Sequence, residues 1–216
     1  MNRKHRKPLR LLSLTFGTAI LISALQPQPA RADDAALYGP EAPPNSAFVR
    51  VVNASADGDV DARVGDKAVD RLGAWGVSEF EFLPAGSQTI VAGAQTQSAQ
   101  LQAGHYYTAV ADGQSLRILE NAGYENRLKA LVILYNLTDQ NNLSLRTTDG
   151  KTTLVEPVQR DNSGAREVNA ARAKLAVFAG DTRIADTQPL TLNRGKALSL
   201  FAIGPAASPK LVYATN

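Results

Sequence analysis

The feature that most constrains this chain is a series of short alternating runs of apolar and polar residues. In Phe48–Val52 and in Tyr106–Val110, successive side chains would point to opposite faces of a strand. Turn-forming residues end such runs, as Asn53 and Gly65-Asp66 do. No longer window carries a convincing apolar stripe with helical spacing. The pattern therefore predicts an all-β fold, built as a sandwich or barrel of short strands.

The second half of the chain repeats the first half in the same order. The segment 130–138 resembles 48–55, and Asn136 follows Asn53 at an offset of 83. Three later matches raise the offset to 95, as loop insertions would: Val91–Gly93 with Val177–Gly180, Gln102–Tyr106 with Asn193–Ala197, and Leu116–Leu119 with Leu211–Tyr213. We therefore expect two tandem β-sandwich modules related by internal duplication, over residues 47–120 and 130–216. The linker between them, 121–129, is short and polar, so the modules should pack on each other.

The segment 1–32 has the three parts of a secretory signal peptide. A basic start is followed by Leu11–Leu25, an uncharged apolar run, then by Gln26–Pro29 and the small-residue site Ala30-Arg31-Ala32. We place cleavage after Ala32. The apolar run is shorter than the roughly 20 residues that a membrane anchor needs. The mature chain should be a soluble, exported protein that starts with a proline-rich lead-in, 33–46.

Loss of the signal changes the charge and leaves few groups for chemistry. The formal net charge of +3 becomes −3, because the segment 1–32 holds six Lys or Arg and no acid. No basic cluster remains for nucleic acid. The chain has no cysteine, and His105 is the one histidine after Ala32, so disulfides are excluded and a metal site is not expected. The sequence predicts no metal and no cofactor.

The residues also give no catalytic motif. The Gly-x-Ser-x-Gly pattern of serine hydrolases is absent, and a Gly-Asp-Ser pattern appears only as Gly180-Asp181-Thr182. The His-x-x-x-x-Asp pattern of another acyltransferase group is also absent, because Val110 stands five positions after His105. A Ser-His-Asp triad could be built only around His105. Alternating Asp57, Asp59 and Asp61 do not follow the order of a calcium loop and fit a solvated turn. We predict that the chain is not an enzyme and name no catalytic residue.

Aromatic residues outside the alternating pattern are the candidates for partner binding. Tyr38 lies in the lead-in, Trp75 lies in a glycine-flanked turn, and Tyr124 lies near Arg127 in the linker. Exposed Tyr, Trp and Arg side chains dominate binding hot spots. Packing of each loop onto its own sandwich is the alternative. The glutamine-rich stretch 95–102 could line a sugar-binding groove, or it could be the exposed face of a strand.

Several segments together resemble the periplasmic alginate O-acetylation protein AlgF family. The resemblance covers essentially the whole chain and depends on the joint order of pieces that are individually unspecific: Asp33–Pro40, Ser46–Val51, Phe82-Leu83-Pro84, Asn126-Arg127, Lys129–Val132, Asn136-Leu137, Asp149–Thr152 and Gly180-Asp181. None of these pieces is a catalytic motif, and the resemblance supplies no active-site residues.

The resemblance implies a periplasmic role in O-acetylation of mannuronate residues in alginate. It implies two partners, a multi-pass membrane acyltransferase and a periplasmic serine-hydrolase-like acetyltransferase. With no triad in this chain, we expect a non-catalytic accessory or adaptor protein of that complex. The alternatives are an alginate-binding module that uses the glutamine-bearing face, or a weak acetyltransferase or esterase centred on His105.

Overall fold

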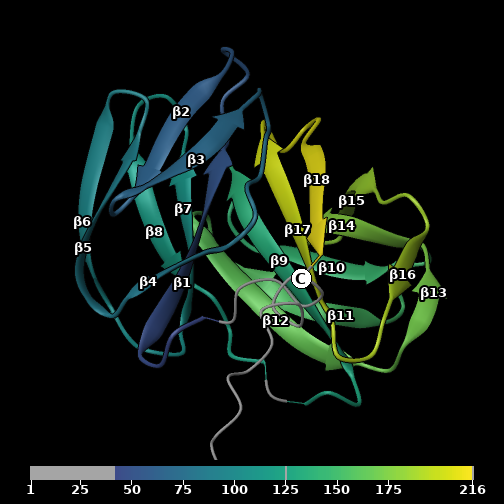
Figure 1. Ribbon diagram of the computed structural model, residues 1–216. Coiled ribbons are helices and arrows are strands. Elements are labelled where there is room, and N and C mark those ends of the chain that lie inside the picture. The colour runs from purple at the N-terminus through teal and green to yellow at the C-terminus, as the bar shows by residue number, and fades with distance from the viewer. Residues whose placement is uncertain (1–41, 125, 216) are drawn as a thin grey trace, which may run out of the picture. The chain divides into compact units, whose positions relative to one another are not determined.

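The structure is a computed structural model that describes residues 42–124 and 126–215, all within one compact unit, Ala42–Asn216. None of these residues lies in a helix, so the prediction of an all-β fold is confirmed (Figure 1). This part of the chain contains no helix that could span a membrane. The predicted signal peptide 1–32, the candidate Tyr38 and most of the lead-in lie outside the described residues.

The first module consists of eight strands in two sheets. The strands are β1 Ser46–Asn53, β2 Val60–Val64, β3 Lys67–Leu72, β4 Glu81–Pro84, β5 Gly86–Ala92, β6 Gln95–Leu101, β7 Tyr106–Ala111 and β8 Leu116–Glu120. One sheet has the order β4-β1-β7-β8 and the other β3-β2-β5-β6. β1 and β7 are parallel neighbours, whereas every other pair in these two sheets is antiparallel.

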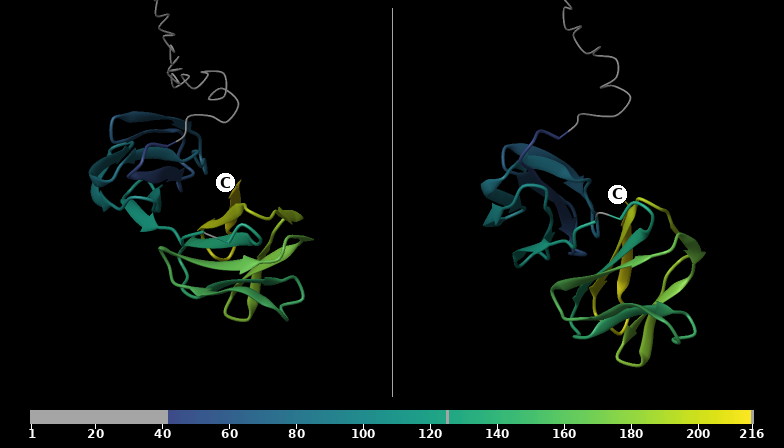
Figure 2. Two further views of the ribbon diagram at one scale, coloured as in Figure 1. Left: turned by 60° about the horizontal axis from the view of Figure 1, so that its bottom comes forward. Right: turned by 90° about the horizontal axis from the view of Figure 1, so that it is seen from below.

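The second module consists of ten strands. They are β9 Ala130–Thr138, β10 Leu143–Thr147, β11 Thr153–Val158, β12 Asn162–Val168, β13 Ala171–Ala173, β14 Leu175–Ala179, β15 Thr182–Asp186, β16 Leu190–Leu192, β17 Ala197–Gly204 and β18 Lys210–Thr215. Two four-stranded sheets have the orders β12-β9-β17-β18 and β11-β10-β14-β15, and β13 pairs with β16. Figure 2 shows the strands of this module, coloured green to yellow, from two further directions.

Strand pairing confirms the internal duplication. β9 and β17 are parallel neighbours like β1 and β7, and each pair is flanked by one antiparallel strand on either side. The register also agrees, because Asn53 lies opposite Ala111 and Asn136 lies opposite Ala202. The two asparagines that the sequence aligns therefore occupy equivalent positions in the two modules.

The β5–β6 hairpin shows how the copies have diverged. In the first module it is an unbroken ladder from Gly86 opposite Leu101 to Ala92 opposite Gln95. In the second module the corresponding ladder is divided between β14–β15 and β13–β16. Pro189 lies at the division, and proline removes a backbone donor from a ladder. The pair β13–β16 is thus the base of the same hairpin.

Each module has its own hydrophobic core between its two sheets. Val49 and Val51 of β1 point into the first core, and Val132 and Leu134 of β9 point into the second. All four side chains are fully buried. Because successive strand residues face opposite sides, the other faces of β1 and β9 are available for a different contact.

Candidate functional site

A third apolar cluster joins the outer faces of the two modules. We call it the interface cluster; its buried members are Val52, Val110, Leu131, Ile133, Tyr135, Leu137, Ala197, Phe201 and Ile203. The first two belong to β1 and β7, and the others to β9 and β17. Every residue of β9 is buried, because one face packs in the second core and the other in this cluster. The sheets that contain the parallel pairs therefore pack on each other.

Arg50 lies beside this cluster with none of its surface exposed. Its Nε donates to Thr108 Oγ1 at 3.0 Å, within the first module. Its Nη2 donates to Tyr135 OH at 3.0 Å and to Ser199 Oγ at 2.7 Å, both in the second module. One guanidinium thus links strands of both modules.

Aromatic rings surround the same guanidinium. Its Cζ lies 4.7 Å from the ring centre of Phe80, 5.0 Å from that of Phe201 and 5.5 Å from that of Tyr135. Burial lowers the pKa of Arg50, and the neighbouring Tyr135 partly opposes this. An arginine keeps its proton at neutral pH even so. The rings and hydroxyls stabilise a desolvated cation that forms no ion pair within the described chain, where its Nη1 also has no hydrogen-bond partner.

A small cavity adjoins these residues. Its volume is about 200 Å³, and its lining includes Phe80, Tyr106, Asn121, Tyr124 and Ile133. Asn121 connects the cavity to the hydroxyl groups that bind Arg50, because Asn121 Oδ1 accepts hydrogen bonds from Thr108 Oγ1 at 3.0 Å and Tyr135 OH at 2.8 Å. The lining is mainly aromatic and aliphatic.

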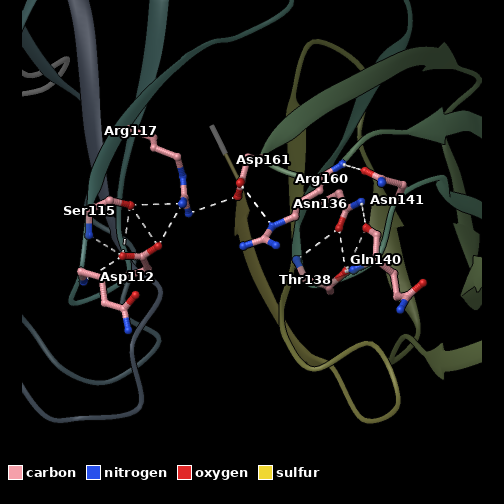
Figure 3. A network of polar contacts seen from close by, with 10 residues as sticks. Asp112, Ser115, Arg117, Asn136, Thr138, Gln140, Asn141, Arg160 and Asp161 are labelled. Carbon is pink, nitrogen blue, oxygen red and sulfur yellow. Dashed lines mark hydrogen bonds and ion pairs between the residues drawn. The ribbon is translucent and has the colours of Figure 1, made fainter.

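A second set of polar contacts crosses between the modules (Figure 3). Arg117 of β8 pairs with Asp112 at 2.9 Å and with Asp161 at 3.2 Å, and Asp161 also pairs with Arg160 at 3.4 Å. Asp161 lies in the β11–β12 turn with a φ of 58°. Burial would raise the pKa of Asp112, but backbone hydrogen bonds from Ser115 and Gln114 and the charge of Arg117 outweigh this and hold that pKa below its usual value.

The predicted partner-binding residues lie at different places. Trp75 has a φ of 64°, and both Trp75 and Tyr124 are partly buried against the interface cluster. Tyr124 OH also donates to the Lys129 carbonyl at 2.7 Å. Arg127 is exposed. The structure brings Trp75 and Tyr124 to one cluster and leaves Arg127 at the surface, and a role of any of them in partner binding stays a prediction.

His105 faces a carboxylate. Its Nδ1 lies 2.6 Å from Glu120 Oε1, with 42% of the histidine side chain and 50% of the glutamate side chain exposed. No hydroxyl hydrogen-bonds to His105 within residues 42–124 and 126–215. In the same part of the chain, no three His, Asp or Glu side chains are grouped as metal ligands would be.

The other polar residues singled out in the sequence are placed as follows. Gln97 and Gln100 of β6 line a groove beside β8, whereas Gln95 donates to the Gly113 carbonyl at 2.9 Å. Asn53 and Asn136 are fully buried, and their amides donate to carbonyls at the strand ends, which confirms their role in organising turns.

Sequence reasoning missed Arg50 and Arg117. Arg50 had been included in an alternating strand pattern, where a charge normally indicates the solvent face. A signal was present, because Thr108, Tyr135 and Ser199 are polar residues at neighbouring register positions of strands that are otherwise apolar. Those positions could not be paired across the modules without the tertiary structure.

The fold and this interface define a two-module all-β protein whose duplicated sandwiches are held together through the outer faces of their mixed sheets. The family model described as "Alginate O-acetyl transferase AlgF" matches residues 19–199. The chain belongs to the AlgF family.

Curated relatives match along nearly the full length. The chain is 38% identical to the alginate biosynthesis protein AlgF of Pseudomonas syringae pv. tomato, over 98% of this chain and 95% of the relative. It is 37% identical to AlgF of Pseudomonas aeruginosa, over 94% of this chain and 91% of the relative. For Azotobacter vinelandii AlgF the identity is 38%, over 95% and 94%.

Two solved structures are also similar. The C-terminal domain of AlgF from P. aeruginosa is 36% identical and covers 41% of this chain and 99% of its own, with a TM-score of 0.38. The N-terminal domain of the same protein is 35% identical and covers 38% of this chain and 100% of its own, with a TM-score of 0.34.

Proposed function

We propose that this protein is a non-catalytic periplasmic adaptor required for O-acetylation of mannuronate residues in alginate. It would act in complex with a membrane acyltransferase and a periplasmic serine-hydrolase-like acetyltransferase. Membership of a family whose relatives are named alginate biosynthesis proteins supports the pathway. We also propose that residues 1–32 are removed on export, and that the lead-in 33–46, the modules 47–120 and 130–216 and the linker 121–129 make up the mature adaptor.

The observation that carries the adaptor role is the Arg50 linkage within the interface cluster. Hydrogen bonds to Tyr135 and Ser199 and a shared apolar cluster hold two sandwiches in contact. A chain built in this way offers partners the remaining strand edges and loops of two modules at once. When two binding sites are linked in one body, the second binding event becomes intramolecular, so the overall affinity can exceed the affinity of either site alone.

The test is direct binding of the chain from Asp33 onwards to each purified acyltransferase, measured by titration calorimetry. We expect at least one dissociation constant in the micromolar range or below. In cells, loss of this protein should abolish acetylation of alginate while polymer formation continues. Clean absence of binding to both acyltransferases would overturn the adaptor proposal.

The pair His105–Glu120 favours one second candidate, a weak acetyltransferase or esterase. A carboxylate at Nδ1 orients an imidazole so that its Nε2 can act as a base, as in hydrolase triads. This candidate requires that the purified protein cleave or transfer acetyl groups and that His105→Ala abolish the activity. Absence of any activity leaves the adaptor proposal in place. An activity that survives His105→Ala would contradict both the His105 candidate and the non-catalytic role.

The alternative of an alginate-binding module has the groove lined by Gln97 and Gln100 as its site. Titration with mannuronate oligomers decides it. Saturable binding that is lost in Gln97→Ala and Gln100→Ala would favour polymer contact over partner contact at this groove.

A further inference from the structure

β6 is the outer strand of the β3-β2-β5-β6 sheet. The two-residue turn between Ala92 and Gln95 makes these two residues a hydrogen-bonded pair, and such pairs alternate along an antiparallel ladder. Thr96, Ser98 and Gln100 therefore direct their backbone groups away from β5. In agreement, the Ser98 carbonyl accepts a hydrogen bond from the side-chain amide of Gln97 at 3.2 Å.

This edge lacks the features that protect edge strands from pairing. Natural sheets protect their edges with charges, prolines, bulges or short strands. β6 has seven residues without a charge or a proline, and its register with β5 is unbroken. Its counterpart β15 has a register shift and the ion pair Arg183–Asp186, and Pro189 follows it. The unprotected edge is thus a property of one copy of the duplicated module.

A groove of about 540 Å³ runs between β6 and β8. Ala99 and Ile118 form part of its floor and pack against the first core, whereas Gln97 and Gln100 lie exposed at its rim. Gln97 lies opposite Ile90, whereas the equivalent Val177 lies opposite Ala185, and Ile184 is the extra residue of the register shift beside it. Ile118 lies opposite Ala109, as Tyr213 lies opposite Leu200 in the second module. Ile184 and Tyr213 pack against the second core. The second module therefore has apolar side chains packed against its core near the position where the first has the exposed Gln97.

The charges at this groove select its occupant. Arg117 is paired with Asp112 and Asp161, and Glu120 is paired with His105. The Arg117 charge is therefore already balanced by carboxylates, and the lining offers no other cation to attract a polyuronate, which favours an uncharged occupant. An uncharged edge whose outward backbone groups pair with no other strand of the described chain, beside an apolar floor, matches an extended polypeptide whose alternate side chains are apolar.

We propose that β6 and its groove bind an extended, uncharged segment of the periplasmic serine-hydrolase-like acetyltransferase, which adds as a fifth strand to the β3-β2-β5-β6 sheet. The proposal rests on the adaptor function and names the contact that this function uses. Backbone hydrogen bonds supply the affinity, and the floor at Ala99 and Ile118 selects apolar residues at alternate positions.

Hydrogen exchange of the mature chain, alone and with the purified acetyltransferase, tests the proposal. The free amides of Thr96, Ser98 and Gln100 should exchange at least tenfold more slowly in the complex, whereas those of β15 should not change. If the acetyltransferase binds and the β6 amides are unaffected, the docking site is wrong and the adaptor function stands. If neither acyltransferase binds, both are wrong. Concentration-dependent protection in the chain alone would identify a second copy as the occupant and overturn the assignment to a partner.

Two substitutions separate backbone contacts from side-chain contacts. Ser98→Pro removes an N–H that the β5 ladder does not use, and it should weaken acetyltransferase binding at least tenfold. Ser98→Ala keeps the N–H and should bind like the wild type. Gln97→Ile places a branched apolar side chain in the groove, so it should also weaken binding. This variant decides the matter if circular dichroism finds Ser98→Pro unfolded. Wild-type affinity in Gln97→Ile and in a folded Ser98→Pro would contradict the proposal.

Discussion

Arg50 carries a full charge between Val49 and Val51, two fully buried residues of the first core. The charge is accommodated because β1 alternates, so that Arg50 points to the opposite face and meets hydroxyls and aromatic rings there. Removing it would leave a cavity and unpaired hydroxyls. A buried donor or acceptor without a partner costs about 1–3 kcal/mol.

We therefore expect Arg50→Ala to lower the free energy of unfolding by about 2–5 kcal/mol, the range for large-to-small changes at buried sites. Arg50→Met keeps most of the volume and should cost about half as much. Urea denaturation followed by tryptophan fluorescence measures both, with Trp75 as the probe. Equal losses for the two variants would mean that packing volume is not what Arg50 contributes.

The two buried asparagines give a second prediction at this scale. Asn53 and Asn136 donate their amide hydrogens to backbone carbonyls, and each is the first residue of an Asn-x-Ser/Thr sequence. Asn→Asp at either position replaces the donor with a carboxylate that faces carbonyls, and it should cost at least about 2 kcal/mol.

Asn142→Asp is the matched control. Asn142 also begins an Asn-x-Ser sequence but is exposed, and its Oδ1 accepts from Gln159 at 2.6 Å, which an aspartate can equally do. The change in unfolding free energy should stay within about 0.5 kcal/mol. A similar loss at all three positions would contradict the assigned roles.

At the scale of elements, the edge strands β11 and β12 of the second module approach closely at Gly164. A Cβ at this position would lie 2.7 Å from Val158 Cγ2 and 3.1 Å from Val155 Cγ1. Both valines are buried and cannot move aside freely. Gly164→Ala should therefore lower the free energy of unfolding by about 1–3 kcal/mol through overpacking.

Gly123→Ala serves as the comparison for Gly164→Ala in thermal unfolding. A Cβ on Gly123 would have no atom within 4 Å, and its φ is not in the left-handed region. The substitution should leave the midpoint unchanged. If Gly164→Ala is equally neutral, β11 can move away from β12 without cost.

At the scale of the whole molecule, the interface cluster should couple the two sandwiches thermodynamically. Calorimetry of the wild type should give a single transition, because unfolding one module would expose the apolar outer face of the other. Val52→Asp places a charge in this cluster and should divide the transition in two. Val91→Asp, a partly buried valine outside the three clusters, should keep a single transition. Two transitions in the wild type would mean that the modules unfold independently.

The prediction of the fold succeeded where the signal was local. Alternation in Phe48–Val52 and the turn at Gly65-Asp66 depend on neighbours in the sequence, and the repeated landmarks preserved their order. The division of β13 from β14 was not predicted. Pro189 directly precedes β16, whose partner β13 is separated from it in the sequence by β14 and β15. The sequence singles out Trp75 and Tyr124 because they lie outside the alternating pattern. Both are partly buried against the interface cluster, and their role in partner binding stays a prediction.

The sequence by itself determined the all-β class, the duplication and the family, because periodicity and the order of the repeated segments can be read along the chain. The tertiary structure alone decided which polar residues are buried and which strand edge is open. Arg50 and a surface arginine have the same pattern in the sequence, and only the packing of β1 against β9 and β17 separates them. The burial of a charge depends on contacts between residues that lie 85 and 149 positions apart, and no local pattern records such contacts.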